Sequence, residues 1–483
     1  MPKCLRSAAA ILVAGAGMAL SGCSITGSEH PELGLTIPAS YRAAAKGNVD
    51  AAVPVVAWWR GFRSEELTTL MESAQLYNLD IAAAIAQIVQ ADAQVGVSGA
   101  ALLPSISGTA SAEREHLGSQ SASSSGVSTG AGGTTFSQYT VGLTASYMLD
   151  FWGKNRATLQ AAEESASVSR YNRDVVTLTT VVTVANTYFQ ILAAQDQIRV
   201  TRRDLAAAER ILTLIRDQFK GGTASQLDLS QQEALVATQR AAIPPLEVTL
   251  GQNTAALALL VAKAPADFRV RGGSTTQIVV PRVTPGLPSE LLYQRPDVRQ
   301  AEAQLASSNF SVEAARAAFF PQIQLTGTTG FQSVALASLF GPGAWYYTLA
   351  AGLTQPIFDG FLLESQLKLA KGLQLQYLQA YRKAVLSAFA DVEKALIALQ
   401  KYTLQERLQV DVVTSSRKAF EVAETQLRGG TVNLITVLQT QQTLFTAENT
   451  LVQVRLLKLQ AASSLFQALG GGWTPAGTLA VLQ

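Results

Sequence analysis

The chain contains the same unit twice, and this duplication constrains its fold more than any other feature. Residues 78–104 align without a gap with residues 295–321 at an offset of 217, and Lys220-Gly221-Gly222-Thr223 matches Arg428-Gly429-Gly430-Thr431 at an offset of 208. A longer Ser/Gly-rich loop at 119–135 accounts for the nine-residue difference. A length of 483 residues suggests about three domains as a first guess. The repeat instead predicts one duplicated unit.

Each unit has the pattern of a helix, a β-hairpin, a very long helix, a turn and a returning helix. Residues 154–220 contain no glycine or proline, and residues 361–428 contain one glycine and no proline. As a continuous helix, either segment would be about 100 Å long at 1.5 Å per residue. The Gly-Gly pairs at 221–222 and 429–430 are predicted to end these helices, because glycine readily adopts the left-handed cap conformation.

The returning helices are predicted over 223–262 and 431–469, so each half ends in a long antiparallel helical hairpin. Pro244-Pro245 should break the first returning helix, whereas the second has Val452-Gln453 at the equivalent place. Apolar residues recur in steps of three and four, the spacing of a coiled-coil seam. The predicted seams are Val168, Tyr171, Val175, Leu178, Val182, Ala185, Phe189 and Leu192; Leu378, Tyr381, Val385, Ala388, Val392, Ala395, Leu399 and Tyr402; and Ile435, Leu438, Phe445, Val452, Leu456, Leu459 and Phe466, the last interrupted by Gln442, Asn449 and Ser463.

The segments 105–151 and 322–358 are predicted to be β-hairpins, because one strand in each has alternating apolar residues. In a transmembrane strand, apolar residues that face the lipid alternate with small or polar residues that face the inside of the barrel. The same alternation would also suit a half-buried sheet of a soluble protein. Residues 105–114 and 322–331 are the weaker partner strands. The alternating apolar residues are Tyr139, Val141, Leu143, Ala145, Tyr147, Leu149 and Phe151, then Trp345, Tyr347, Leu349, Ala351, Leu353 and Ile357; Tyr139, Phe331, Trp345 and Tyr347 are predicted to belong to an aromatic girdle.

The number of strands requires more than one chain. One chain supplies four, lipid tolerates no open sheet edge, and the smallest common barrels have about eight strands. Arg202, Arg203, Asp204 and Glu209 place the long helices outside the hydrocarbon, where we expect these charges on a wet helical wall. An isolated periplasmic coiled coil is the alternative, and the strand pattern argues against it.

Residues 1–22 are predicted to form a secretory signal peptide. Two basic residues precede an apolar run of 13 residues, Ala8–Leu20, which is too short to span a bilayer. The run ends in Leu20-Ser21-Gly22-Cys23, which resembles a bacterial lipobox, so we expect cleavage before Cys23 and a lipid on its thiol. Ser24 follows, instead of the Asp that retains lipoproteins at the inner membrane, which favours the outer membrane. A plain signal peptide, with Cys23 incidental, is the alternative.

Composition argues against enzymatic chemistry and nucleic-acid binding. Lys and Arg total 37, Asp and Glu total 35, and no basic block occurs. Two histidines, His30 and His116, and two cysteines, Cys4 and Cys23, provide little for a metal site or a Cys/His catalytic pair. No GxxxxGK[ST] phosphate-binding loop is present. We therefore expect no enzyme, no metal and no cofactor apart from a covalent lipid on Cys23.

Six short motifs occur in order along the mature chain. They are Trp58-Trp59-Arg60-Gly61-Phe62, Asn78-Leu79-Asp80, Asp150-Phe151-Trp152-Gly153-Lys154, Gln294-Arg295-Pro296-Asp297-Val298-Arg299, Arg428-Gly429-Gly430-Thr431 and Gln441-Gln442-Thr443-Leu444-Phe445. Together they resemble the outer-membrane factor family, the TolC/OprM/NodT superfamily of outer-membrane efflux lipoproteins. The resemblance implies an α+β membrane protein, a homotrimer with a 12-stranded outer-membrane β-barrel (four strands per chain) continued by a 12-helix periplasmic α-barrel.

The resemblance also assigns a place to each part of the chain. It implies a lipidated N-terminal and equatorial segment at 23–77, a first repeat at 78–263, an equatorial link at 264–294, a second repeat at 295–469 and a C-terminal tail at 470–483. The link then joins the repeats and is not a flexible domain linker. We expect Trp58 and Trp59 to pack against the equator.

The implied function is the passive exit duct of a tripartite efflux system for drugs or other small molecules. Such a duct docks on a periplasmic adaptor (a membrane fusion protein) and is driven by an inner-membrane pump, usually of the resistance-nodulation-division class. The hairpin tips at Gly221, Gly222, Gly429 and Gly430 are the expected adaptor-docking surface. The expected periplasmic gate lies beside them, with Asp217, Phe219, Lys220, Glu424, Leu427 and Arg428 as candidates. Ordinary solvated charges at helix ends are the alternative for this region.

Two other functions share part of this pattern. The outer-membrane channel of a type I protein secretion system has the same architecture, and the lipobox favours small-molecule efflux over it. A structural lipoprotein of the periplasm would have no membrane strands and no conductance.

Overall fold

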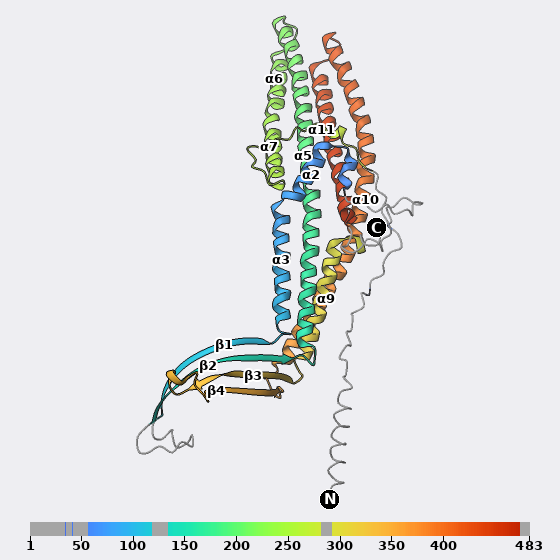
Figure 1. The fold of residues 1–483 in the computed structure, drawn as a ribbon. Helices are drawn as coiled ribbons and strands as arrows, with labels where there is room; N and C mark the ends of the chain where they lie inside the picture. Colours follow the sequence, from blue (N-terminus) through green and yellow to red (C-terminus); the bar gives the residue numbers. More distant parts are fainter. Residues whose placement is uncertain (1–33, 35–40, 42–56, 118–133, 282–291, 474–483) are drawn as a thin grey trace.

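The computed structural model describes residues 34, 41, 57–117, 134–281 and 292–473. The predicted signal peptide, Cys23, Ser24 and His30, most of the 119–135 loop, part of the 264–294 link and the end of the 470–483 tail lie outside the described residues. The described part forms a long rod of helices with a four-stranded sheet at one end, and the sheet extends sideways from the rod (Figure 1).

The first repeat contains α3 (Leu79–Ala100), β1 (Ser105–Leu117), β2 (Thr134–Leu149), α5 (Lys154–Lys220), α6 (Gln226–Ala241) and α7 (Ile243–Leu260). The second contains α9 (Pro296–Ala317), β3 (Gln322–Ser333), β4 (Trp345–Thr354), α10 (Leu362–Arg428) and α11 (Leu434–Ala468). Between and before them lie η1 (Trp58–Phe62), α2 (Glu65–Tyr77) and η2 (Thr275–Gln277), with η3 (Leu336–Ser338) in the β3–β4 turn and η4 (Gly470–Gly472) after α11.

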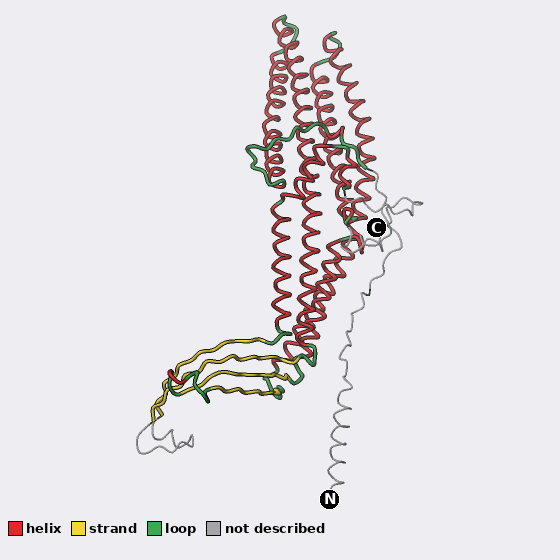
Figure 2. The backbone as a smooth tube through the Cα atoms, in the orientation of Figure 1, coloured by secondary structure: helices red, strands yellow, loops and turns green. Residues whose placement is uncertain are grey.

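The two long helices, α5 and α10, run from the sheet to the opposite end of the rod (Figures 1 and 2). Each has 67 residues, and their bounds agree with the predicted segments to within one residue. Gly372 lies inside α10 without ending it, since an isolated glycine costs a helix only about 1 kcal/mol. The first returning helix ends at Ala241 and restarts at Ile243, with Pro244-Pro245 in its first turn, while α11 is continuous over the equivalent residues. The predicted proline break is therefore confirmed.

Six of the eight residues of the seam predicted for the second long helix are buried, and Leu399 and Tyr402 are partly buried. Tyr381, Val385, Ala388, Val392 and Ala395 belong to one core cluster, which also includes Leu465 and Ala468 of α11. The larger cluster lies near the middle of the rod, where Trp58 and Trp59 of η1 are each 4% exposed. The Trp58 ring stacks on Phe466 with centroids 4.7 Å apart. The same cluster includes Phe268 of the equatorial link, so the two tryptophans pack against the equator as predicted.

The described part of the equatorial link is held by two carboxylates. The backbone amides of Arg271 and Gly272 donate to Glu66 of α2 at 2.7 and 3.1 Å. The amide and hydroxyl of Thr275 both donate to Asp196 of α5, at 2.9 and 2.7 Å. These bonds attach the link to α2 and to α5 of the first repeat, as expected of a segment that is not a flexible linker.

The sheet has the order β1-β2-β3-β4, and every pair is antiparallel. The central pair, β2 with β3, joins the hairpin of the first repeat to that of the second. β1 extends three residues beyond the predicted end at Arg114, so His116 belongs to this strand, and its Nδ1 lies 2.7 Å from Thr135 Oγ1. Pairing with β2 extends the strand past the alternating pattern.

Candidate functional site

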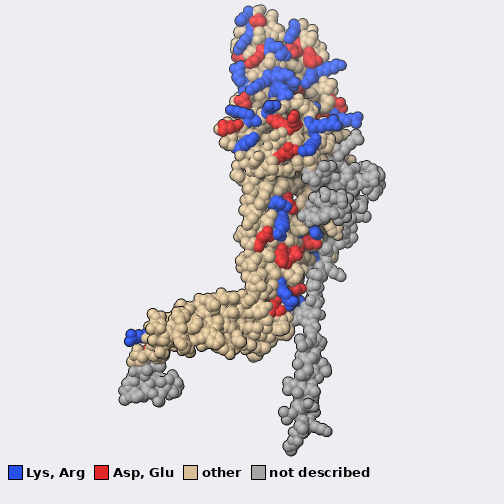
Figure 3. All heavy atoms as spheres, in the orientation of Figure 1, with Lys and Arg blue, Asp and Glu red and all other residues tan. Residues whose placement is uncertain are grey.

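The two faces of the sheet differ sharply in chemistry. Residues opposite one another in the ladder share a face, and Leu143, for example, lies opposite Gly108 and Thr329. One face is mainly apolar, with Arg114 and His116 of β1 on it toward the end away from the helices. Its larger apolar side chains are Ile106, Tyr139, Val141, Leu143, Tyr147, Leu149, Ile323, Leu325, Phe331, Trp345, Tyr347, Leu349 and Leu353. The other face is mainly serine, threonine, glutamine and glycine. β2, β3 and β4 contain no charged residue, and Figure 3 shows the sheet nearly free of charge beside the charged rod.

Aromatic side chains lie at both ends of the apolar face. At the end away from the helices, Phe331 lies opposite Trp345, and the rings of Trp345 and Tyr347 are 5.4 Å apart. At the helical end, Trp152 stacks on Phe320 with centroids 4.8 Å apart. The sequence predicted the first group and missed the second, whose residues lie outside the strands. An apolar band between two aromatic girdles is typical of an outer-membrane strand set.

The strands β1 and β4 are free edges of this sheet. Lipid offers no hydrogen bonds to an unpaired strand, so an open edge cannot remain in a bilayer. Trp345, Tyr347, Leu349 and Leu353 of β4 are 60–81% exposed. The sheet of one chain is therefore one part of a larger closed structure.

The tips of the two helical hairpins have the same backbone geometry. Gly222 and Gly430 have φ of 74° and 69°, whereas Gly221 and Gly429 have ordinary helical φ. At the first tip, the amide of Thr223 donates to Gln218 O at 2.8 Å, and Thr431 does the same to Gln426 O at 2.9 Å. These are Schellman ends, in which only the second glycine needs the left-handed conformation.

The gate candidates occupy the last turns of α5 and α10. Asp217 and Lys220 are exposed on α5. Glu424 accepts from Arg428 of its own helix at 2.7 Å, so this pair lies within one helix of the protomer. Leu427 is 5% exposed and packs in the core shared by α5, α10 and α11. The structure thus gathers these residues at one end of the rod, and their gating role stays a prediction.

An ionic cluster is buried where α5, α10 and α11 meet. Glu448 of α11 is 4% exposed; it accepts a hydrogen bond from Arg203 of α5 and, at 2.5 Å, one from Nη2 of Arg417 of α10. Asp204 is 6% exposed, and its Oδ2 has no hydrogen-bond partner among the described residues. Burial, together with the charge of Glu448, raises the pKa of Asp204 to about 7, although the charges of Arg203 and Arg417 oppose the shift.

The prediction that the charged residues of this region face solvent is therefore wrong for Asp204. Arg202 and Glu209 fit it, with side chains 62% and 46% exposed. The cause lies in α11, which packs on both α5 and α10 and so buries a wider face than a two-helix seam.

The seam predicted for α11 is displaced by one residue near the tip. Buried there are Leu434, Val437, Gln441, Leu444 and Glu448. The predicted seam residue Ile435 is 50% exposed, and the predicted polar interruptions Gln442 and Asn449 are not buried. This shift explains why the sequence did not identify Glu448 as a buried acid.

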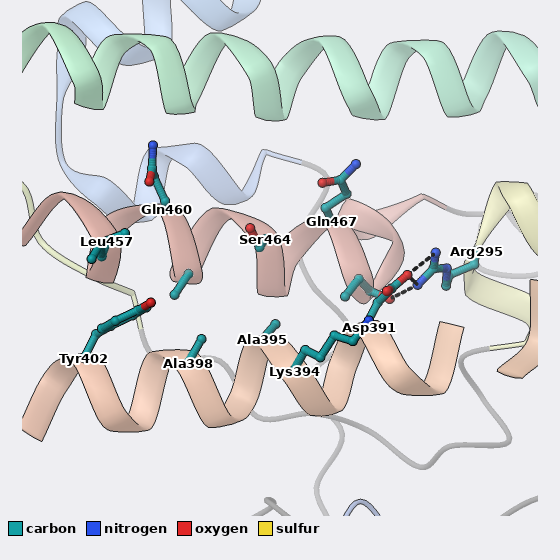
Figure 4. Close-up of a pocket in the computed structure, with 12 residues that line it drawn as sticks. Arg295, Asp391, Lys394, Ala395, Ala398, Tyr402, Leu457, Gln460, Ser464 and Gln467 are labelled. Atoms are coloured by element: carbon teal, nitrogen blue, oxygen red, sulfur yellow. Dashed lines mark hydrogen bonds and ion pairs between the residues drawn. The ribbon is translucent and has the colours of Figure 1, made fainter. Parts of the chain in front are cut away.

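Arg295 ties the start of the second repeat to its long hairpin. Its guanidinium donates to Asp297 at 2.7 and 2.9 Å, to Asp391 of α10 at 3.4 Å and to the carbonyl of Ala468 at the end of α11 at 3.3 Å. Figure 4 shows this group at one end of a cavity of about 500 Å³ between α10 and α11. Small side chains, including Ala395, leave this space open. The Arg-Pro-Asp motif thus fixes helix positions.

The comparisons with known proteins agree on one family. The sequence model of the outer membrane efflux protein family matches residues 70–263 and 287–471. The chain belongs to the outer membrane efflux protein family. The pyoverdine export outer membrane protein OpmQ of Pseudomonas aeruginosa is 37% identical over 440 residues, which cover 91% of this chain and 92% of that protein. The probable efflux pump outer membrane protein TtgC of Pseudomonas putida is 31% identical over 462 residues, covering 94% and 93%.

Solved structures show the same fold. The outer-membrane channel OprN superposes with a TM-score of 0.85 at 23% identity, over 92% of this chain and 98% of that one. The open state of the Neisseria gonorrhoeae MtrE outer membrane channel gives 0.79 at 28% identity, over 92% and 97%. This member of the outer membrane efflux protein family is accordingly a subunit of an outer-membrane efflux channel that extends into the periplasm.

This assignment confirms the predicted family, fold, location and efflux function. The four strands of the chain belong to the outer membrane and the long helices to the periplasm. The protein-secretion alternative is not favoured, because the relatives are named for efflux and export of small molecules and ions. The family and fold are those of outer-membrane channels and not of enzymes.

Proposed function

We propose that three copies of this chain form a passive exit duct, in which twelve strands close a barrel and twelve helical segments wall a tunnel. The observation that carries the proposal is the sheet itself, in which β2, β3 and β4 contain no charged residue, one face is mainly apolar and the two edges, β1 and β4, are open. Pairing β4 of one copy with β1 of the next closes the sheet without leaving an edge in lipid.

The helices support the same closure. Within the chain, α9 packs between α5 and α10, whereas its repeat equivalent α3 packs along α5 and leaves its other side open. That open side contains Ile85, Val89 and Val97, which are 49–67% exposed. α10 likewise exposes Leu369 and Leu386. Placing α3 against α10 of the next copy would repeat the α9 arrangement and cover both sets of residues.

The sequence contains no GxxxxGK[ST] phosphate-binding loop, and we assign the energy of transport to partner proteins. We assign the tips around Gly221-Gly222 and Gly429-Gly430 to a periplasmic adaptor, and the driving force to an inner-membrane pump of the resistance-nodulation-division class. The free ends of the helical hairpins lie farthest from the sheet, where a trans-periplasmic partner can reach them (Figure 1). The pump class rests on the family resemblance.

Closure of the duct is assigned to the same end. Threefold symmetry would place Asp217, Lys220, Glu424, Leu427 and Arg428 in rings beside the tips. Opening would then break the Glu424–Arg428 ion pair within α10, and the two side chains would contact solvent or a partner protein instead. The lipid on Cys23 would hold the N-terminus at the outer membrane, each buried methylene adding about 0.8 kcal/mol. No cofactor besides this lipid belongs to the proposal.

The first test is the oligomeric mass of the detergent-purified protein by native mass spectrometry, together with its single-channel conductance in planar bilayers. We expect a trimer with small, flickering conductance that Glu424→Ala or Arg428→Ala widens. A monomer, or a protein that never inserts, would refute the duct.

The second test concerns the partners and the lipid. A deletion strain should become susceptible to small toxic compounds, and wild-type protein should restore resistance better than Cys23→Ala. Deleting the resistance-nodulation-division pumps of the strain should reproduce this phenotype. If deleting ATP-driven pumps reproduces it instead, the pump class is wrong while the duct stands.

A further inference from the structure

The buried ionic cluster joins the two repeats within one chain. Arg203 belongs to α5 of the first repeat, and both Arg417 of α10 and Glu448 of α11 belong to the second. The cluster therefore has the order base–acid–base, with the acid at the centre. It lies about 26 Å from the hairpin tip, since 17 residues separate Arg203 from Lys220 at 1.5 Å per residue.

The repeat supplies an equivalent for each member of this cluster. A shift of 208 residues superimposes the bounds of α5 on those of α10, and it aligns the start of α6 and the end of α7 with the ends of α11. Under this shift Arg203 corresponds to Asp411, Arg417 to Glu209 and Glu448 to Arg240. All three charges are inverted, so the equivalent set has the order acid–base–acid.

Two members of the inverted set already form the equivalent contact. Arg240 Nη2 of α6 donates to Glu209 Oε1 of α5 at 2.8 Å, as Arg417 does to Glu448 at 2.5 Å. The third member, Asp411, is exposed on α10 and has no ion pair in the part of the protomer that the structure describes. The Arg240 side chain is 68% exposed, whereas Glu448, which α5 covers, is 4% exposed. The inverted set thus lacks the helix that would complete it.

We infer that Asp411 of each protomer pairs with Arg240 of the partner subunit, which forms an intersubunit triad with that subunit's Glu209. The inference rests on the proposed homotrimer, in which α10 of one copy would lie against α6 of the next as α5 lies against α11 within the chain. Three base–acid–base triads within chains then alternate with three acid–base–acid triads between chains around the wall.

The inversion gives the assembly its specificity. If α10 met a second α11 at this level, Asp411 would face Glu448, and if α5 met a second α6, Arg203 would face Arg240. Both mismatches place like charges together, which disfavours the wrong pairing. The triads therefore favour an assembly in which first and second repeats alternate around the wall. Apolar seams alone would specify this order less well.

Cysteine cross-linking tests the contact directly in the full chain. We expect Asp411→Cys with Arg240→Cys to give covalent dimers and trimers on denaturing gels after treatment with a short bis-maleimide. The matched control is Arg203→Cys with Glu448→Cys, which should link within one chain and leave its mass unchanged. Each single variant and the wild type, which retains its native cysteines, should give no ladder.

A charge exchange provides the second test. Asp411→Arg should raise the dissociation constant of the trimer roughly tenfold, about 1.4 kcal/mol, because it places a cation opposite Arg240. Adding Arg240→Glu and Glu209→Arg converts the triad to the base–acid–base order and should restore the wild-type constant. A wild-type monomer would refute the proposed duct. A wild-type trimer that neither cross-links at this pair nor responds to Asp411→Arg would refute the triad alone.

Discussion

Replacing Asp204 by asparagine should stabilise the protein at neutral pH and not at acidic pH. The carboxyl is buried beside Glu448, and its pKa lies near 7 instead of the ordinary 3.8. Because the folded state holds this proton more tightly than the unfolded state, stability falls as pH rises from about 4 to about 7. Between pH 5 and pH 8 the loss amounts to roughly 3 kcal/mol, since each pH unit below the folded pKa contributes about 1.4 kcal/mol.

Asp204→Asn removes this titration while keeping the shape of the side chain. We expect the unfolding free energy of the variant, relative to the wild type, to increase by roughly 3 kcal/mol between pH 5 and pH 8. Guanidinium unfolding of the detergent-solubilised protein, followed by circular dichroism at several pH values, measures this difference. Asp217→Asn is the matched control, because it makes the same chemical change at an exposed position of α5. A constant difference across pH, or a larger one at pH 5, would refute the argument.

Three further changes probe other parts of the structure. Gly330→Ala should abolish barrel assembly on denaturing gels, because its Cβ would lie 2.3 Å from Val141 O, whereas Gly352→Ala, with no atom within 4 Å, should assemble normally. Glu406→Gln should remove a loss of stability that the wild type shows at acidic pH. Burial opposes the shift, but the hydrogen bonds from Lys458 and Arg455 lower the pKa of Glu406, so the wild type loses this stabilisation as pH falls below about 4.5. The variant should not lose it, and unfolding midpoints from pH 3 to 7 measure the difference. Gly222→Ala should destabilise the first hairpin tip by about 1 kcal/mol, because φ is positive at this residue, whereas Gly221→Ala should not. Hydrogen exchange of the backbone amides at the tip distinguishes the two variants. Equal protection in both would contradict the assignment of Gly222 as the left-handed residue.

The long helices could be predicted almost to the residue because their ends are determined locally. A glycine precedes α5 and another follows it, and no glycine or proline lies between them. The proline pair likewise breaks the first returning helix in its own first turn. Local backbone chemistry decides such features, so a single sequence is enough to place them.

The strands and the buried cluster could not be predicted as well, because distant partners decide them. β1 continues beyond the predicted end at Arg114 to Leu117 because β2 pairs with it there. Glu448 is buried because α11 packs against two helices at once, which moves its buried face by one residue from the predicted seam. The apolar pattern of one helix does not reveal how many other helices pack against it.

The two halves of the duplication have diverged where assembly makes different demands on them. Asp204, beside the triad within the chain, corresponds under the 208-residue shift to Val412, which is 46% exposed in the protomer. The contact between α5 and α11 forms once, within one folding chain, and the folded protomer tolerates a buried acid there. At the seam between chains, an acid in place of Val412 would have to be desolvated in every copy during association, at several kcal/mol per ion. An apolar residue at this position favours association instead, and the exposed charges of Asp411, Arg240 and Glu209 keep the seam soluble until the subunits meet.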